Sequence, residues 1–211
     1  MAVLNVDKVF KFVQFIANKE SRGWVDPAEF NIAAELAQIA VYSRLESYFL
    51  GNKKTHSDMR PFLKDSDETI AAGVCPFPTG FRQLIECRLA TTNIPVNELT
   101  QAEITAALNS LISAPSATYP ACVIRDDGIH IYPDTLTGDV TVEFVGGLTT
   151  APKWDYTVVT SRPVYASGTS VQFEFEDNLF LEISMLVAAN VGMNINAESL
   201  TQYGMAFNAQ K

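Results

Sequence analysis

The segment PACVIRDDGIHIYPDTLTGDVTVEFVGG, residues 120–147, holds the clearest strand pattern in the chain and decides its fold class. Ala121–Arg125 and Ile129–Tyr132 are short apolar runs on either side of Asp126-Asp127-Gly128. Because an Asp-Gly pair tolerates the positive φ of a tight turn, these runs predict a β-hairpin. In Asp139–Val145, valine and phenylalanine alternate with threonine and glutamate, which predicts a strand with one buried face.

Weaker strand patterns lie on both sides of this segment. Phe81–Leu89 alternates between apolar and polar side chains and predicts another strand. Trp154–Tyr156 and Val171–Phe175 complete the predicted β region. Before the first strand, the sequence predicts a loop over Lys53–Ser66 and a short helical turn near Asp67–Ala72.

Helical patterns flank the strands. Val6–Lys19 carries one apolar stripe, and Pro27–Phe49 follows a strong N-cap residue, Asp26. Thr100 and Glu103 have the spacing of a capping box and predict a short helix between two strands. The helix from Pro27 has apolar side chains around so much of its circumference that we expect burial on more than one side. These side chains are Phe30, Ala34, Ala37, Val41, Leu45 and Tyr48, with Ile32, Leu36 and Ile39 widening the stripe.

Two further helices are predicted near the C-terminal end, Asn178–Val191 and Ala197–Asn208. Because helices stand at both ends of the sequence and strands in the middle, we expect an α+β fold. In this fold the N- and C-terminal helices form a helical bundle, with a β-rich insertion in the middle. The expected helical body comprises residues 1–72 and 177–211, and the β-containing insertion comprises residues 73–176.

Charge is distributed unevenly over the 211 residues. The chain has 24 acidic and 15 basic side chains, a net charge of -9, and the whole excess lies in residues 89–211. This half lacks the basic surface that nucleic-acid binding requires. The charged fraction of only 18%, with 10% aromatic residues, suits a protein that buries surface in an oligomer. No apolar stretch reaches the ~18 residues of a transmembrane helix, so we expect no membrane contact. The one local basic cluster is Lys53, Lys54, His56 and Arg60.

The sequence contains no motif for catalysis, cofactor binding or metal binding, and we expect a non-enzymatic protein without a cofactor. His56 and His130 lack partner ligands in the sequence, which favours structural or surface roles. The acidic run Asp126-Asp127 near Asp134 lacks the spacing of a calcium loop, which favours a solvated turn. The three cysteines have no CxxC spacing and are interpreted as buried free thiols from a reducing cytoplasm: Cys75, Cys87 and Cys122.

Two groups of residues leave functional alternatives open. Glu174 and Glu176 lie two residues apart and could form the carboxylate pair of a hydrolase, although an exposed acidic edge is favoured. Aromatic side chains could form a platform for a carbohydrate, although filling of a sheet core is favoured. These aromatic residues are Trp154, Tyr156, Tyr165 and Phe173.

Three groups of segments carry a family resemblance that covers most of the chain. They are Phe15–Lys19, Arg22–Val25, Pro27–Asn31 and Ala37-Gln38, then Ile129–Pro133 and Pro152–Trp154, then Val191–Asn194 and Leu200–Tyr203. In these segments the sequence resembles the head-tail connector proteins of short-tailed phages, including crAss-like phages, which are adaptor or ring proteins of the virion. The shared motifs are structural, and none of them is catalytic.

The resemblance implies a homo-oligomeric ring of twelve copies that bridges the portal protein and the tail in the neck of the virion. It implies assembly in the host cytoplasm, contacts with other connector or tail proteins, and passage of DNA without sequence-specific binding. It also implies a portal-docking tail with Tyr203, Phe207 and Lys211, and inter-subunit contacts at Trp154 and Tyr156. The alternatives are another virion component, such as a tail or head accessory protein, and a carbohydrate-binding tail module.

Overall fold

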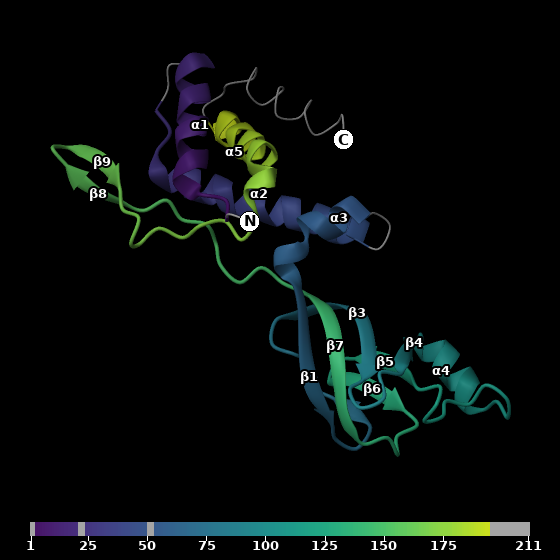
Figure 1. The fold of residues 1–211 in the computed structure, drawn as a ribbon. Coiled ribbons are helices and arrows are strands. Elements are labelled where there is room, and N and C mark those ends of the chain that lie inside the picture. The colour runs from purple at the N-terminus through teal and green to yellow at the C-terminus, as the bar shows by residue number, and fades with distance from the viewer. Residues whose placement is uncertain (1–2, 21–23, 50–52, 195–211) are drawn as a thin grey trace. The chain divides into compact units, whose positions relative to one another are not determined.

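The computed structural model describes residues 3–20, 24–49 and 53–194, which belong to two compact units (Figure 1). One unit, Phe62–Gly147, is continuous in sequence and is called the seven-stranded unit. The other, called the helical unit, combines Met1–Pro61 with Leu148–Lys211. Each unit is built around its own buried side chains.

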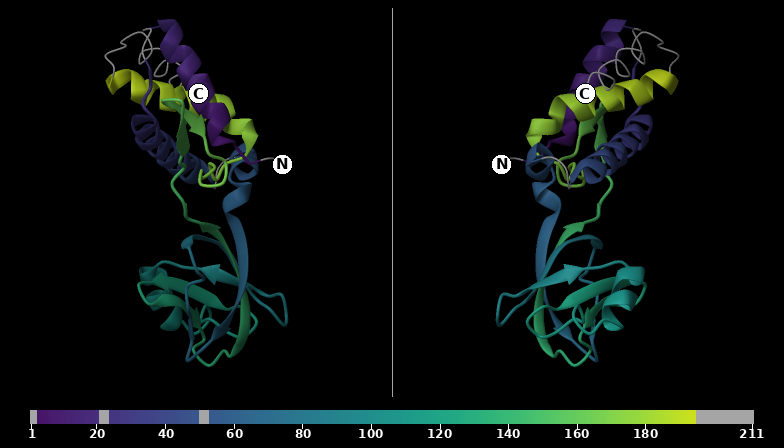
Figure 2. Two further views of the ribbon diagram at one scale, coloured as in Figure 1. Left: turned by 90° about the vertical axis from the view of Figure 1, so that its left-hand side faces the viewer. Right: turned by 90° about the vertical axis from the view of Figure 1, so that its right-hand side faces the viewer.

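A single sheet forms the seven-stranded unit and curves until it is nearly closed (Figure 2). Its order is β1-β7-β3-β4-β5-β6-β2, and all neighbours are antiparallel except β4 and β5. The edge strands β1 and β2 follow each other in sequence and are joined by a bridge between Ala71 and Val74. The strands are β1 (Leu63–Ile70), β2 (Val74–Cys75), β3 (Phe81–Leu89), β4 (Pro95–Glu98), β5 (Ala121–Arg125), β6 (Gly128–Tyr132) and β7 (Gly138–Gly146).

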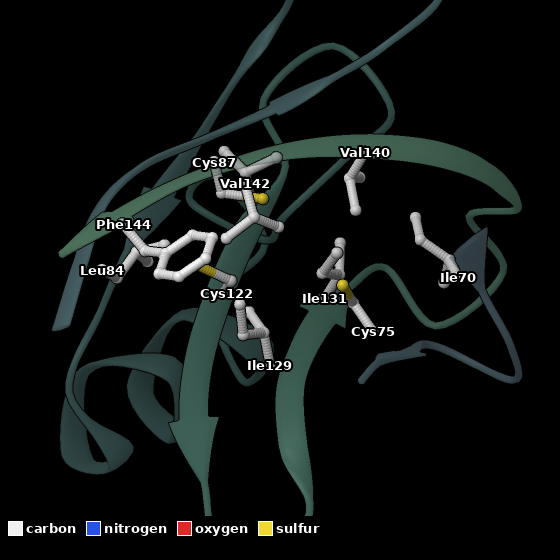
Figure 3. Packing of buried hydrophobic residues seen from close by; sticks show 11 residues of the cluster. Ile70, Cys75, Leu84, Cys87, Cys122, Ile129, Ile131, Val140, Val142 and Phe144 are labelled. Atoms are coloured by element: carbon white, nitrogen blue, oxygen red, sulfur yellow. The ribbon is translucent and has the colours of Figure 1, made fainter. Parts of the chain in front are cut away.

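The interior of this sheet is apolar, and every one of its strands contributes a buried side chain (Figure 3). Outside the sheet, helix α4 (Gln101–Leu108) packs Ile104 against β5. The predicted capping box of this helix is confirmed, because Thr100 and Glu103 satisfy each other's backbone N–H groups. The interior residues are Ile70, Cys75, Leu84, Cys87, Val96, Cys122, Ile129, Ile131, Val140, Val142 and Phe144.

The predicted fold class, an α+β helical bundle with a β-rich insertion, is wrong. The fold is mostly β, and its nearly closed seven-stranded sheet dominates, accompanied by five α-helices in the described part of the chain. The prediction failed chiefly at β1, which was expected to be loop and helical turn. In β1, LKDSDETI, only Ile70 is buried, so its own sequence shows no alternation of apolar residues. Its strand conformation comes from pairing with β7, from Leu63 opposite Val145 to Ile70 opposite Gly138.

In the helical unit, α1 and α2 each pack against α5. The helices predicted over Val6–Lys19, Pro27–Phe49 and Asn178–Val191 are confirmed to within a few residues at their ends. Asp26 caps α2 as expected, because its carboxylate accepts the N–H of Ala28 at 2.7 Å. The helices are α1 (Val6–Glu20), α2 (Pro27–Tyr48), α3 (Lys53–Asp58) and α5 (Phe180–Asn194), with the short 3-10 helices η2 (Arg60–Phe62) and η3 (Asp177–Leu179).

A second, two-stranded sheet belongs to the helical unit. It consists of β8 (Tyr156–Val159) and β9 (Arg162–Tyr165) and is called the ribbon. The predicted strand Val171–Phe175 is wrong, because only Val171 makes a β-bridge, to Lys153. The remaining part of that segment makes backbone hydrogen bonds to Leu4, whose N–H donates to the Phe175 carbonyl at 2.8 Å, and the side chains of Phe173 and Phe175 are buried in the core.

Candidate functional site

Helix α2 leaves a row of large apolar side chains uncovered. Ile32, Leu36 and Ile39, here called the α2 stripe, are exposed to 63%, 54% and 46%. Steps of four and three residues place them on one face of the helix. The opposite face, which includes Phe30, Ala37 and Val41, is buried in the helical unit. The sequence predicted burial on more than one side, and in the single chain the second side remains exposed.

The charges around the α2 stripe are negative. Glu29 and Glu35 are exposed on the same helix, and neither forms an ion pair within the described chain. Arg44, the basic residue of α2, forms an ion pair with the buried carboxylate of Glu182 instead. Burial lowers the pKa of the Arg44 guanidinium, with Asp58 opposing that shift. The stripe is therefore an apolar surface with an acidic edge.

The ribbon is the second exposed apolar surface. Its two strands pair only with each other in the described chain, so both outer edges of this small sheet are open. Figure 1 shows the ribbon projecting past α1. Because side chains alternate between faces, Thr157 and Val159 share a face with Val164 and Arg162, their cross-strand partners. This face, called the outer ribbon face, is exposed at all four residues.

The turn of the ribbon is conformationally costly. Thr160 and Ser161 both have positive φ, 50° and 61°. Two consecutive residues of this kind are usually Asn and Gly, because a Cβ is crowded there and a β-branched one most of all. Two-stranded ribbons are marginally stable even with favourable turns. The ribbon therefore depends on contacts made beyond its own hydrogen bonds.

One such contact is at the base of the ribbon, where Trp154 anchors it to the helices. The buried indole stacks on Phe10 of α1 with ring centroids 4.1 Å apart, and its Nε1–H donates to Asp7 at 3.0 Å. The backbone N–H of Trp154 donates to the Asn31 side chain of α2 at 2.7 Å. The two residues predicted as inter-subunit contacts thus differ: Trp154 is buried within the helical unit, and Tyr156 is exposed.

The aromatic side chains proposed as a carbohydrate platform lie around this anchor. Tyr156 and Tyr165 stack near the Trp154 indole, with ring centroids 5.8 Å and 5.9 Å away, and Phe173 is buried. A sugar platform needs an open aromatic face. In this cluster the indole is covered by Phe10, and its role is to hold the ribbon.

The third exposed apolar surface is the loop after α4 in the seven-stranded unit. Leu111 and Ile112 are fully exposed, at 103% and 97%, and Tyr119 is also exposed. The loop borders a groove of about 520 Å³ whose floor includes Leu99 and Ala121. Two adjacent, fully solvated aliphatic side chains contribute nothing to the core of their own unit, so their position suits contact with another molecule.

The residues considered for metal binding do not converge. His56 on α3 stacks on Phe49 with ring centroids 4.0 Å apart, and His130 Nε2 lies 2.7 Å from an Asp127 carboxylate oxygen. The contact with His130 lowers the pKa of Asp127. Asp134 lies in the turn between β6 and β7. Within residues 3–20, 24–49 and 53–194, no group of three or more His, Cys, Asp or Glu side chains is placed to hold a metal ion.

Glu174 and Glu176, the carboxylates considered as a hydrolase pair, both have structural partners. A Glu174 oxygen accepts the backbone N–H groups of Thr149 at 2.7 Å and Thr150 at 2.5 Å. Glu176 forms an ion pair with Arg60 at 2.8 Å. The Glu174 contacts join the segments on either side of the ribbon to each other, and the Glu176 ion pair joins the second segment to η2, so the carboxylates act as braces for the ribbon's base.

All three cysteines lie in the interior of the seven-stranded sheet, as expected for buried free thiols. Burial raises the pKa of Cys75 to about 11. It raises the pKa values of Cys87 and Cys122 to about 12, and the neighbouring cysteines add to the effect. Because the thiolate is the reactive form, these protonated thiols are unreactive near neutral pH.

The predicted portal-docking residues Tyr203, Phe207 and Lys211, with the predicted helix Ala197–Asn208, lie outside the described residues. None of the described helices is both long and apolar enough to cross a bilayer. No protein-family model matches the chain, and no curated protein matches it at a significant level.

The three surfaces differ in how clearly the sequence indicates them. The sequence contained the period of the α2 stripe, and burial within one chain was the wrong interpretation. The only sequence signal for the Leu111-Ile112 surface is that two large apolar residues stand next to each other in a loop otherwise rich in Ser, Ala and Pro. The Thr160-Ser161 turn had none, because neither residue type is typical of two successive positive φ angles.

Proposed function

We propose that the protein is a non-enzymatic structural subunit of the virion, a head-tail connector that assembles into a ring between the portal protein and the tail. The observation that carries this proposal is the α2 stripe. A soluble monomer rarely exposes a row of large apolar side chains on a helix whose inner face is already buried. A subunit of a permanent assembly covers such a surface with its neighbour.

Two further features support a connector in particular. The three groups of segments that resemble connector proteins come from both units, and one of them includes Pro27–Asn31 at the start of α2. The negative charge concentrated in residues 89–211 repels phosphate, which favours free passage of DNA past the assembled subunits. The function is geometric: a closed ring presents a surface to the portal on one side and to the tail on the other.

The test is native mass spectrometry of the purified protein, alone and with the portal protein of the same phage. We expect closed rings or portal-bound rings for the natural chain. The variant Ile32→Ser/Leu36→Ser/Ile39→Ser should lose them while its far-UV circular dichroism is retained. Leu181→Ser is the matched control, because Leu181 is exposed to 46%, like Ile39, and lies on α5. Its assembly should be unchanged.

A natural chain that stays monomeric and binds neither portal nor tail particles contradicts the proposal. A triple variant that assembles as well as the natural chain removes the α2 stripe as its support.

A further inference from the structure

We infer that neighbouring subunits contact each other through the outer ribbon face of one copy and the α2 stripe of the next. This inference rests on the proposed ring function and identifies the surfaces that build the ring. Both surfaces belong to the helical unit, both are exposed in the described chain, and both carry apolar side chains, which on the outer ribbon face are Val159 and Val164. Within the described residues they do not cover each other, so each is open to contact with another copy.

The charges on the two surfaces are complementary. Arg162 lies on the outer ribbon face and forms no ion pair with the residues that the structure describes. Glu29 and Glu35 flank the α2 stripe, and the basic residue of that helix is engaged with Glu182. An apolar helix face with an acidic edge therefore fits a ribbon face that carries two valines and a guanidinium. Complementary charges of this kind fix register and exclude wrong partners.

Three features of the ribbon also indicate that a contact with the next subunit stabilises it. Its two edges are open, its turn carries two residues in left-handed conformations, and Trp154 anchors it to the helices at its base. A helix of the next subunit under the outer ribbon face would bury Val159 and Val164, which are now exposed. This burial would offset the cost of the turn.

The geometry of such a contact leads directly to a ring. The ribbon and the α2 stripe are different surfaces, so the contact is head-to-tail rather than two-fold symmetric. Each bound pair still has one free ribbon and one free stripe, and further copies add until rotation closes the assembly. The inference therefore also accounts for growth beyond a dimer.

A charge-exchange experiment tests the pairing. Arg162→Glu should raise the protein concentration at which half of the subunits assemble by about tenfold or more, because it places like charges together. The double variant Glu29→Lys/Glu35→Lys should have a similar effect. The combination of all three substitutions should restore assembly to within about threefold of the natural chain. Sedimentation velocity at low ionic strength measures all four proteins.

The matched control is Lys153→Glu, which changes the net charge as Arg162→Glu does but lies outside the outer ribbon face, where Lys153 already pairs with Asp155 at 3.5 Å. It should assemble as the natural chain does. Restoration in the combined variant requires a folded ribbon, so it separates lost pairing from misfolding.

Two results overturn the inference: single-surface variants that assemble normally, or a combined variant that is no better than they are. In either case the proposed function stands as long as the natural chain forms rings on the portal. Failure of the natural chain to assemble or to bind portal and tail particles overturns the proposed function instead.

Discussion

The two units of this chain use their apolar residues in opposite ways. In the seven-stranded unit, side chains from every strand point into one interior, and even the cysteines belong to it. In the helical unit, α2 is apolar on two sides, and one of these sides is exposed together with the outer ribbon face. Apart from the loop after α4, the seven-stranded unit thus buries its large apolar side chains internally, whereas the helical unit leaves the α2 stripe and the outer ribbon face exposed.

This difference separates stability from assembly along a single chain. Substitutions inside the seven-stranded sheet remove contacts that the chain makes with itself. Substitutions on the α2 stripe remove apolar area that water already reaches, so they should leave the fold in place and weaken contacts between subunits.

The largest effect is expected in the interior of the sheet. Phe144→Ala should lower the free energy of unfolding of the seven-stranded unit by about 3–5 kcal/mol, because the buried ring leaves a cavity. Leu36→Ala on the α2 stripe should change the stability of the helical unit by no more than about 0.5 kcal/mol. Urea unfolding followed by far-UV circular dichroism measures the loss.

Tryptophan fluorescence separates the two units in this experiment. Both tryptophans, Trp24 and Trp154, belong to the helical unit. The fluorescence transition should therefore respond to Phe144→Ala less than the dichroism transition does. If Leu36→Ala is as destabilising as Phe144→Ala, the α2 stripe is part of a core and the contrast between the units is lost.

The same interior should also make stability depend on pH under alkaline conditions. Because burial raises the pKa values of the three thiols, the folded unit keeps them protonated where unfolded thiols ionise. Their contribution is complete below the ordinary value of 9.0 and is lost as the pH rises toward about 11 for Cys75 and about 12 for the others. The free energy of unfolding should fall by up to about 1.4 kcal/mol per pH unit for each thiol.

Urea titrations at several pH values between 8 and 11 give this slope. Cys87→Ala is the control, since it should reduce the slope by about one third. A free energy of unfolding that is independent of pH through this range would mean that the thiols ionise as readily in the folded unit as in the unfolded chain.

The smallest effect on stability is expected in the loop after α4. Leu111→Ser/Ile112→Ser should change the free energy of unfolding by less than about 0.5 kcal/mol, because both side chains are fully exposed. The same circular dichroism measurement applies. A decrease in the free energy of unfolding above about 1 kcal/mol would show that Leu111 and Ile112 stabilise their own unit. The loop would then not be a surface reserved for contact with another molecule.

The sequence was sufficient for elements with local signals. Helix α2 has a cap at Asp26, a fixed-φ residue at Pro27 and apolar side chains on two sides, and the Asp-Gly turn identified the β5–β6 hairpin. These features act over a few residues, so they can be recognised without knowing what packs against them.

The nearly closed sheet could not be found in this way. The two strands that close one side of it, β1 and β7, are separated by most of the seven-stranded unit, and β1 is mostly polar because one of its faces meets solvent. The strand with which β1 pairs is determined by tertiary structure, and the spacing of apolar residues within β1 does not indicate it. The same holds for the exposed surfaces. The helical spacing places the apolar Leu36 on one face of α2, but it does not indicate whether another part of the same chain covers that face.

The pairing of Leu63 with Val145 has a consequence for how such a chain can evolve. The points where the chain enters and leaves the seven-stranded unit are neighbours on adjacent strands, about 5 Å apart. A connection of one or two residues spans that gap. Recombination can therefore remove the intervening gene segment, or exchange it for another whose ends are equally close, without stretching the remaining chain. The seven-stranded unit can in this sense be removed or exchanged as one continuous segment, while the helical unit is retained.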